Sequence, residues 1–361
     1  MAVALPVCVK DFEDFAQRNL PKYVYNYFAG GSSDEQTLQD NVKAYRRIWL
    51  KPRLMRDVSN RDLSTTILGQ RIAFPIAISP TGVHCMAHPD GEIATARAAA
   101  ALETGMAVST YSTNKMEEVA RSAPEGLRWL QINVFKDREL LKNFVKRAEN
   151  LGFKALFLTM DKPVEGAGRY NVHGKFVLPA QYSLGNFQGL INVRSYAQTD
   201  KLRDKSATWD SVDWLRSITR LPIVAKGILT AEDAREAVKH GVSGILVSNH
   251  GGRGLDGVPA TIDVLSEVVE AVKGSGVEVY VDGGIRMGTD VVKALALGAQ
   301  AVFVGRAVIW GLAYDGENGV KKVLEILRDE FSIAMALSGC RSLDEISADL
   351  VEKRSAYSSK L

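Results

Sequence analysis

From about residue 72 onward, short apolar runs alternate with segments in which apolar residues recur at helical spacing. The apolar runs are continuous, as in strands of a parallel sheet that helices cover on both faces. They predict eight strands, over 72–79, 106–110, 129–134, 154–160, 222–226, 244–248, 277–281 and 301–304. The helical segments predict a helix after each strand, over 92–105, 116–122, 137–151, 211–218, 231–240, 261–272, 288–297 and 319–330.

Repeated strand–helix units joined mostly by short connections predict an α/β fold, a closed (β/α)8 TIM barrel. An open doubly wound sheet is the competing arrangement, but near-uniform units without a break favour closure. The stretch 162–208 after the fourth strand is too long for a plain connection. Because active sites of such barrels lie at that end of the strands, we interpret this long loop as a mobile lid.

The rest of the chain adds to the barrel without forming a unit of its own. Residues 1–71 precede the barrel and predict a helical N-terminal segment. Its helices are expected over 9–18, 22–29 and 34–45. No linker or low-complexity segment interrupts the chain. We therefore expect one domain over 1–361, with the barrel over 72–340 and a C-terminal tail over 341–361.

Composition and charge are those of an ordinary soluble globular protein, with 46% hydrophobic and 24% charged residues. No apolar run reaches the about 18 residues expected of a membrane span. The net charge of +3, without a cluster of Lys and Arg, predicts no nucleic-acid partner.

Cysteine and histidine spacing indicates neither disulfides nor a metal. Cys8, Cys85 and Cys340 are few, odd in number and far apart, which fits a reducing compartment. His84 and His88 lie four residues apart, but Pro89 follows directly and favours a loop. We expect no metal site.

The two ends of the chain carry different targeting information. The N-terminus has an apolar start without a basic region, so a signal peptide is not expected. The chain ends in Ser359-Lys360-Leu361, and Ser-Lys-Leu at a free carboxyl end is read by the peroxisomal import receptor. An accidental solvated tail is the alternative. We predict a peroxisomal location.

The last two strands end in residues suited to a phosphate. Gly283 and Gly284 follow the seventh strand and Gly305 follows the eighth. Glycine lets backbone N–H groups approach phosphate oxygens closely, and barrels often bind phosphate at these two loops. Arg286 and Arg306 can add charge-assisted hydrogen bonds. Turn glycines with surface arginines are the alternative, but the joint placement favours phosphate.

Strands four to six end in residues suited to acid–base chemistry. Lys226 closes an apolar strand, so its buried ammonium needs a negative partner, either a reduced flavin or a structural carboxylate. His250 follows a core strand and is the candidate general base. Arg253 offers a planar fork for a carboxylate, and Asp161 lies at the same rim. A base beside a carboxylate anchor suits a 2-hydroxyacid; a structural histidine is the alternative.

One nucleotide motif is set aside. Residues 252–257 match G-x-G-x-x-G after a strand. Pro259 intrudes, and the spacing is too long for a turn that opens directly into a helix. A nicotinamide cofactor is therefore not expected.

Long motifs in a fixed order resemble the FMN-dependent 2-hydroxyacid oxidases, the family of glycolate, lactate and mandelate oxidising enzymes. The resemblance covers nearly the whole chain. It rests on the motifs Pro21-Lys-Tyr-Val-Tyr-Asn-Tyr27-Phe, Ser79-Pro-Thr-Gly82, Met86-Ala-His-Pro-Asp-Gly-Glu92, Leu221-Pro-Ile-Val-Ala-Lys226-Gly, Ser248-Asn-His-Gly-Gly-Arg253, Asp282-Gly-Gly-Ile-Arg286 and Met335-Ala-Leu-Ser-Gly-Cys-Arg341.

The resemblance implies FMN as cofactor and a complete set of site residues. FMN would contact Pro80, Thr81, Gly82, Ser109, Gln131, Thr159, Lys226, Ser248, Asp282, Gly283, Gly284, Arg286, Gly305 and Arg306. His250 would be the base, Asp161 would orient it, and Lys226 would face the reduced flavin. The substrate would contact Tyr27, Tyr111, Asn133, His250 and Arg253. The family also implies a homotetramer.

The implied reaction takes the hydroxyl proton while hydride passes from C2 to flavin N5, with a carbanion route as the alternative. Oxygen would then reoxidise FMN and release hydrogen peroxide. Two further functions stay open. The chain could be a diverged FMN-binding barrel with little oxidase activity, or a dehydrogenase that uses another electron acceptor.

The sequence departs from the family in the substrate pocket. Tyr111 stands where the glycolate enzymes carry Trp, and Asn133 stands where a Tyr is usual. Gly168 occupies the place of an Arg, with Arg169 shifted by one position. Because a phenol and a guanidinium are lost near the substrate, we expect a pocket that is not optimised for glycolate.

Overall fold

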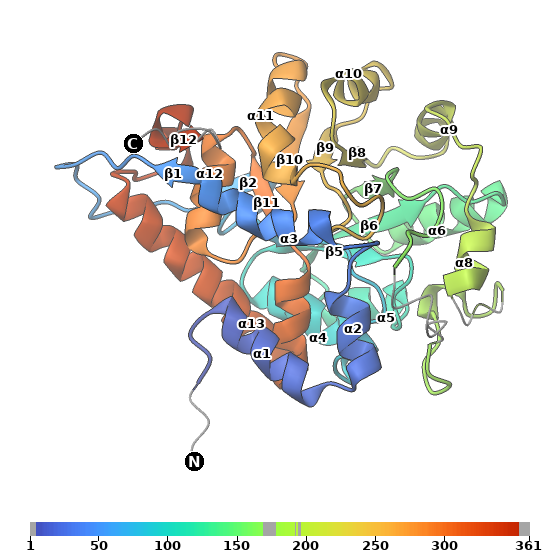
Figure 1. Cartoon of the computed structure of the whole chain (residues 1–361). Coiled ribbons are helices and arrows are strands. Elements are labelled where there is room, and N and C mark those ends of the chain that lie inside the picture. Colours follow the sequence, from blue (N-terminus) through green and yellow to red (C-terminus); the bar gives the residue numbers. More distant parts are fainter. Residues whose placement is uncertain (1–4, 169–177, 192, 194–195, 354–361) are drawn as a thin grey trace.

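A computed structural model describes residues 5–168, 178–191, 193 and 196–353 of the chain. Eight central strands form a closed barrel in which every neighbouring pair is parallel (Figure 1). The strands are β4 (Ile76–Ile78), β5 (Gly105–Ser109), β6 (Leu127–Asn133), β7 (Leu156–Thr159), β8 (Ile223–Ile228), β9 (Gly244–Val247), β10 (Glu278–Asp282) and β11 (Ala301–Val304). They follow one another around the barrel in chain order, and β11 pairs with β4 to close it. The predicted TIM barrel is confirmed.

Helices surround the barrel as the sequence pattern predicts. They are α4 (Gly91–Ala101), α5 (Met116–Ser122), α6 (Arg138–Asn150), α9 (Asp210–Ile218), α10 (Ala231–Lys239), α11 (Thr261–Ala271), α12 (Gly288–Ala296) and α13 (Arg306–Leu337). Local signals fix several helix starts. The Asp137 carboxylate accepts the N–H groups of Glu139 and Leu140 before α6, and the Thr230 hydroxyl accepts that of Asp233 at α10.

One end of the barrel interior is filled by aromatic rings. Trp129, Phe157, Tyr280 and Phe303 are buried there, with ring centroids 5.5–5.7 Å apart. Such packing excludes water from the centre of a barrel and leaves only its mouth for ligands. Any site must therefore be built at the rim.

Three predicted elements differ from the structure. The predicted strand 72–79 is divided, because Ile72 belongs to the hairpin of β2 (Thr65–Ile67) and β3 (Gln70–Ile72), and only β4 enters the barrel. The predicted helix 319–330 is the second part of the much longer α13, whose two parts meet at a kink at Asp315 and Gly316. The tail after 340 also contains β12 (Val351–Lys353), which pairs with β1 (Ile48–Leu50).

The long loop after the fourth barrel strand is not wholly irregular. It contains a short 3-10 turn at Gly185–Phe187 and the helix α8 (Tyr196–Leu202). Residues 169–177 of this loop, including Arg169, lie outside the described residues. The lid over 162–208 therefore stays a prediction.

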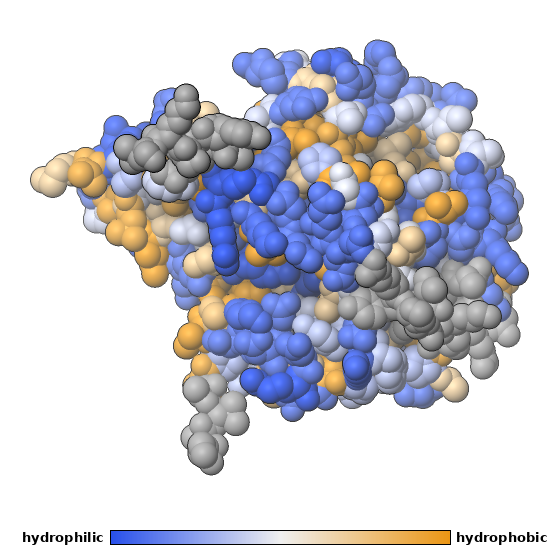
Figure 2. All heavy atoms as spheres, in the orientation of Figure 1, coloured by the Kyte–Doolittle hydropathy of each residue, from blue (hydrophilic) through white to orange (hydrophobic). Residues whose placement is uncertain are grey.

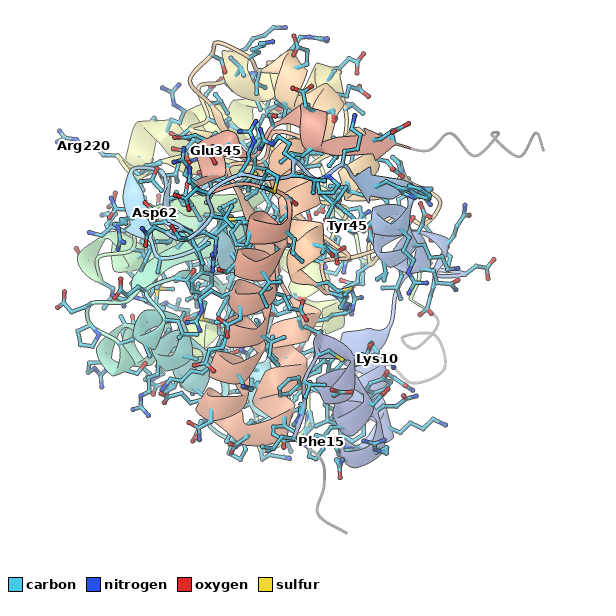
Figure 3. The ribbon with its side chains drawn as sticks, turned by 90° about the vertical axis from the view of Figure 1, so that its left-hand side faces the viewer. Lys10, Phe15, Tyr45, Asp62, Arg220 and Glu345 are labelled. Carbon is cyan, nitrogen blue, oxygen red and sulfur yellow. The ribbon has the colours of Figure 1, made fainter. Side chains whose placement is uncertain are left out.

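The N-terminal segment contains the three predicted helices, α1 (Val9–Asn19), α2 (Lys22–Ala29) and α3 (Gln36–Lys43). Figure 3 shows α1 alongside α13, with Phe15 near the foot of both. The Phe15 and Tyr314 rings meet edge to face at 4.8 Å. This packing joins α1, and α2 directly after it, to the barrel wall.

The visible face in Figure 2 is largely hydrophilic, with hydrophobic spheres gathered on the projection after β1. Leu54 and Met55 in that projection are exposed, as are Ile333 and Leu337 on α13. Across the described part of the chain, no helix is long and apolar enough to cross a bilayer.

Candidate active site

A cavity opens at the carboxyl ends of the barrel strands, with an empty volume of ≈ 1240 Å³ when its open mouth is included. The residues that the sequence assigned to FMN and substrate converge on it. Its walls include Tyr27, Pro80, Thr81, Gly82, Ser109, Tyr111, Gln131, Asn133, Thr159, Lys226, His250, Arg253, Asp282, Gly283, Gly284, Arg286, Gly305 and Arg306. Residues more than 270 positions apart in the sequence thus lie together at one end of the barrel.

Two predicted site residues lie behind this wall. The Asp161 carboxylate is 3.0 Å from His250 Nδ1, and the Ser248 hydroxyl accepts hydrogen bonds from Lys226 Nζ at 3.0 Å and His250 N at 3.1 Å. Neither residue lines the cavity itself. Ser248 holds two residues that face the cavity, and its predicted contact with FMN stays a prediction.

The Asp161–His250 pair fixes which imidazole nitrogen is available. Because a carboxylate accepts hydrogen bonds, we assign the proton to Nδ1, which leaves the Nε2 lone pair free. A Cβ at Gly227 would lie 2.5 Å from Asp161 Cβ, so the glycine after Lys226 makes room for this carboxylate. The packing therefore holds the Asp161 carboxylate in one position behind His250.

Burial sets the protonation of this pair. Burial lowers the pKa of His250 below its ordinary value of 6.5, Lys226 adds to the effect, and the Asp161 charge opposes it. Burial acts to raise the pKa of Asp161, but the positive charges of His250 and Lys226 lower it overall. His250 is therefore neutral and Asp161 ionised near pH 7.

Lys226 brings a buried positive charge to the cavity wall. Its side chain is almost fully covered, and its ammonium lies 3.8 Å from the Asp282 carboxylate. That carboxylate also accepts the Ser79 hydroxyl at 2.8 Å. The lysine thus pairs with a structural carboxylate, one of the two negative partners that the sequence left open. It also faces the cavity.

At one end of the cavity, α13 begins directly after β11, and Gly305 is its N-cap. The first N–H groups of a helix lack partners within the helix and attract anions. A Cβ at Gly305 would meet only Ser79 Cβ, at 3.8 Å. The space in front of this glycine is not occupied by the protein, which fits a phosphate cradle.

The arginines at this end keep donors for a ligand. Arg306 donates to the carbonyl oxygens of Phe28, Gly30 and Gly251 at 2.8–2.9 Å. Arg286 Nη1 donates to its neighbouring Ile285 carbonyl at 2.9 Å. A guanidinium has five N–H donors, so both side chains retain some.

Positive charge is in excess around these groups. Burial and the nearby Arg253 and Arg286 lower the pKa of Arg306 to about 9. Burial also lowers the pKa of Arg286. Since clustered buried cations need anions, this end of the cavity fits the phosphate of FMN.

The two glycine loops allow a matched test of the cradle. Gly305→Ala is expected to weaken FMN binding about tenfold or more while leaving the fold intact, because the new Cβ enters only ligand space. Gly284→Ala would place a Cβ 1.9 Å from the Asn41 carbonyl oxygen at a φ of +81°, and should cost about 2 kcal/mol or more of folding free energy. FMN titration and thermal melting of the apoproteins separate the two effects; an unfolded Gly305→Ala protein would contradict the assignment.

At the other end, Arg253 lies beside α2. Its Nη1 donates to the carbonyl oxygens of Tyr27 and Gly30 at 2.6 and 3.1 Å, and its guanidinium covers the Tyr27 ring at 5.0 Å. The Nε and Nη2 donors remain for a carboxylate. This geometry suits the predicted carboxylate anchor.

Two of the three predicted departures, Tyr111 and Asn133, also face the cavity, whereas Gly168 lines a small cleft that shares Tyr27 and Arg253 with it. Tyr111 stacks on Phe187 at 5.9 Å, and Asn133 accepts from the Gln131 amide at 2.9 Å. Gln131 also donates to the Thr159 hydroxyl at 2.9 Å. Asn133 is therefore tied into a side-chain network on the cavity wall.

Sequence reasoning missed three charged wall residues, Lys162, Glu165 and Arg203. Glu165 accepts from Lys162 at 2.5 Å and from Arg203 at 2.7 Å. The signal available in the sequence was a Lys–Glu pair three positions apart directly after Asp161. Nothing local points to Arg203, which follows α8 far along the loop.

Within the described residues, no group of three or more His, Cys, Asp or Glu side chains is arranged to hold a metal. The ring nitrogens of His84 lie 3.1 and 3.0 Å from the Thr95 and Thr81 hydroxyls. His84 is thus a buried structural residue next to Thr81 of the cavity wall.

Comparison with known proteins agrees with this geometry. The FMN-dependent dehydrogenase family matches residues 16–353. Human 2-hydroxyacid oxidase 1 is 51% identical over 98% of this chain and 99% of its own length, and spinach glycolate oxidase is 51% identical over 94% of each. A crystal structure of mandelate oxidase superposes with a TM-score of 0.90 at 40% identity, covering 97% of this chain and 98% of that one.

The chain belongs to the FMN-dependent dehydrogenase family, and the predicted resemblance is confirmed. It is an FMN-dependent oxidoreductase. The glycine cradle, the helix N-terminus and the surplus of buried cations fit that cofactor.

Proposed function

We propose that this protein oxidises a 2-hydroxyacid to the 2-oxoacid and passes the electrons to oxygen. The substrate loses two electrons and two protons, and oxygen gains them as hydrogen peroxide. The observation that carries the proposal is the convergence of His250, Arg253 and Lys226 on one cavity beside the phosphate cradle. The relatives named 2-hydroxyacid oxidase and glycolate oxidase support it.

Each wall residue has a chemical task in this proposal. Arg253 holds the substrate carboxylate through Nε and Nη2, and Tyr27 donates a hydrogen bond to the substrate. His250 Nε2 takes the hydroxyl proton, and the ionised Asp161, 3.0 Å from Nδ1, stabilises the imidazolium that results. FMN, when bound, supplies the two-electron acceptor. Lys226 balances the negative charge that develops near its ammonium.

Anaerobic mixing with a panel of 2-hydroxyacids tests the proposal. The yellow holoenzyme should bleach with at least one of them, and admission of air should restore the colour with one peroxide per substrate oxidised. A holoenzyme that no 2-hydroxyacid bleaches would be a diverged FMN-binding barrel. Bleaching without rapid reoxidation by air would identify a dehydrogenase with another acceptor.

The pH dependence follows from the state of His250. Only the neutral imidazole accepts a proton, so kcat/KM should rise with pH through the His250 pKa and level off above it. Since burial lowers that pKa, the midpoint of the acid limb should lie below 6.5. The pH profile of kcat/KM checks this, because it reports the pKa values of the free enzyme. A midpoint above the ordinary imidazole value would contradict the assignment.

Glycolate is expected to be a poor substrate. Tyr111, Asn133 and Gly168 replace the larger or more strongly donating residues usual in the family, so a two-carbon acid makes fewer contacts. Losing one preorganised donor costs about 10²–10³ in rate. Comparison of kcat/KM for glycolate with longer 2-hydroxyacids tests this, and equal values would refute it.

We further propose a peroxisomal location, through binding of the import receptor to Ser359-Lys360-Leu361. This tripeptide lies outside the described residues. A relative named peroxisomal (S)-2-hydroxyacid oxidase, 51% identical from Arabidopsis thaliana, supports the proposal. Deletion of the tripeptide should leave a tagged protein outside peroxisomes. The homotetramer implied by family resemblance remains a prediction that light scattering can check.

A further inference from the structure

The cavity wall carries a charged cluster that the proposed reaction does not use. Lys162 and Arg203 are buried, with side chains 8% and 4% exposed, and both donate to Glu165. Arg203 Nη1 also donates to the Lys162 carbonyl at 2.9 Å. Buried ion clusters are costly unless further hydrogen bonds satisfy their polar atoms, and within the described residues Arg203 Nε has no such partner.

The cluster extends along the wall away from the carboxylate anchor. Lys162 and Glu165 line a narrow cleft with Tyr27 and Arg253. Arg203 does not line this cleft, but it is close enough to Tyr111 for its charge to act on the hydroxyl. The Lys162–Glu165 pair contacts Arg203 and shares the cleft with Arg253, so a ligand that follows this wall would meet a cation at each end.

The cluster presents two cations to the cavity. Lys162, Glu165 and Arg203 line the cavity, whereas Asp200, which lies 3.4 Å from Arg203, does not. Burial lowers the pKa of Lys162, and Glu165 opposes that shift. Burial acts to raise the pKa of Glu165, but Lys162 and Arg203 lower it overall to about 2. Burial acts to lower the pKa of Arg203, but Tyr111, Glu165 and Asp200 raise it overall, so Arg203 is a permanent cation of the cavity wall.

Arg203 also has an unused donor. Its Nη1 and Nη2 groups are engaged, but Nε is buried and has no hydrogen-bond partner in the described part of the chain. A buried N–H without an acceptor is costly, and an anionic ligand would satisfy it. An alkyl or aromatic group at this wall would leave the donor unsatisfied.

We propose that Arg203 and Lys162 form a second anion subsite, and that the preferred substrates are 2-hydroxyacids with a second carboxylate. This inference rests on the oxidation proposed above. Arg253 holds the carboxylate next to the reacting carbon, and Arg203 holds the distal one. Arg203 therefore does not take over the role of the guanidinium that is lost at Gly168, because Arg203 binds the distal end of the substrate.

Two acids of equal chain length that differ only in the distal carboxylate test the subsite. For the holoenzyme, kcat/KM for 2-hydroxypentanedioate should exceed that for 2-hydroxypentanoate about tenfold or more. In Arg203→Gln the preference should disappear through a rise in KM for the diacid, with the monoacid changed less than about twofold. A holoenzyme that prefers the monoacid would overturn the inference, as would an equal loss for both acids, which would place Arg203 at the reacting carboxylate.

A binding measurement gives a readout independent of turnover. Titration of the flavin absorbance with 2-oxopentanedioate and 2-oxopentanoate should show the same tenfold preference and the same loss in Arg203→Gln, whereas equal affinities for the holoenzyme would overturn the inference. Lys162→Gln should show the loss too, which keeps the test valid if one variant folds poorly. Arg147→Gln is the matched control, because Arg147 pairs with Glu117 at 2.8 Å outside the cavity.

Failure of the two proposals is distinguishable. If no 2-hydroxyacid bleaches the flavin but the dioate still binds more tightly, the proposed oxidation fails and the subsite stands. If 2-hydroxypentanoate bleaches the flavin and the dioates neither bind nor react better, the subsite fails and the oxidation stands.

Discussion

Replacement of His250 by Asn is expected to slow FMN reduction by a 2-hydroxyacid about 10²–10⁴-fold, while FMN stays bound. The loss follows because no other described group on the cavity wall pairs a neutral proton acceptor with a buried carboxylate 3.0 Å behind it. Asn suits the backbone here, since His250 has a φ of 58° and Asn tolerates this left-handed region. Stopped-flow reduction of the holoenzyme measures the effect.

The chain offers a matched control for this variant. His240 Nδ1 lies 2.9 Å from Asp213 in a similar pair that does not line the cavity. His240→Asn should reduce FMN at the normal rate. If His250→Asn did the same, His250 would not be the base.

Lys226→Met is expected to slow FMN reduction about 10²–10³-fold and to shift the FMN midpoint potential to more negative values. The buried ammonium lies 3.8 Å from Asp282, and its removal takes away the ion-pair partner of that carboxylate among the described residues. Negative charge gained on reduction would then be opposed by Asp282. Redox titration beside a reference dye reports the potential.

Lys321→Met provides the comparison, because Lys321 pairs with Glu317 at 2.6 Å on α13, away from the cavity. It should change neither rate nor potential. An unchanged potential in Lys226→Met would show that this lysine is only a structural partner of Asp282 and Ser248.

The barrel could be predicted because each strand is buried on both sides and bounded by an amphipathic helix. The misplaced elements are those set by contacts distant in sequence. Ile72 is apolar like its neighbours, but it pairs with Thr65 below the barrel. In α13, the kink at Asp315 and Gly316 breaks the helical pattern, so its first part was not recognised as a helix.

The catalytic rim could be predicted because barrel geometry brings the ends of all strands together. The packing behind the rim could not be predicted. Ser248 lies one residue past a strand, like other wall residues, yet it is fully buried and holds Lys226 and His250. The sequence does not show which residues after a strand face the cavity and which hold the residues that do.

Arg203 is a wall residue that could not be predicted from the sequence. It lies after α8 in a segment without a repeating pattern, and its place at the wall depends on Glu165, 38 positions earlier. From the missing guanidinium at Gly168, the sequence predicted only a pocket that is not optimised for glycolate. The structure adds Lys162 and Arg203 to the cavity wall, and the proposed preference for a second carboxylate rests on them.

A crystal structure of the holoenzyme with a bound 2-oxoacid would show whether cofactor and substrate meet at the barrel mouth. We expect the FMN phosphate at the start of α13 beside Gly305 and Arg306. We also expect the carboxylate next to the keto carbon to bind Arg253, and the keto carbon to lie between His250 Nε2 and the flavin ring. FMN bound outside the barrel mouth, or an acid whose keto carbon lies away from His250, would contradict this arrangement.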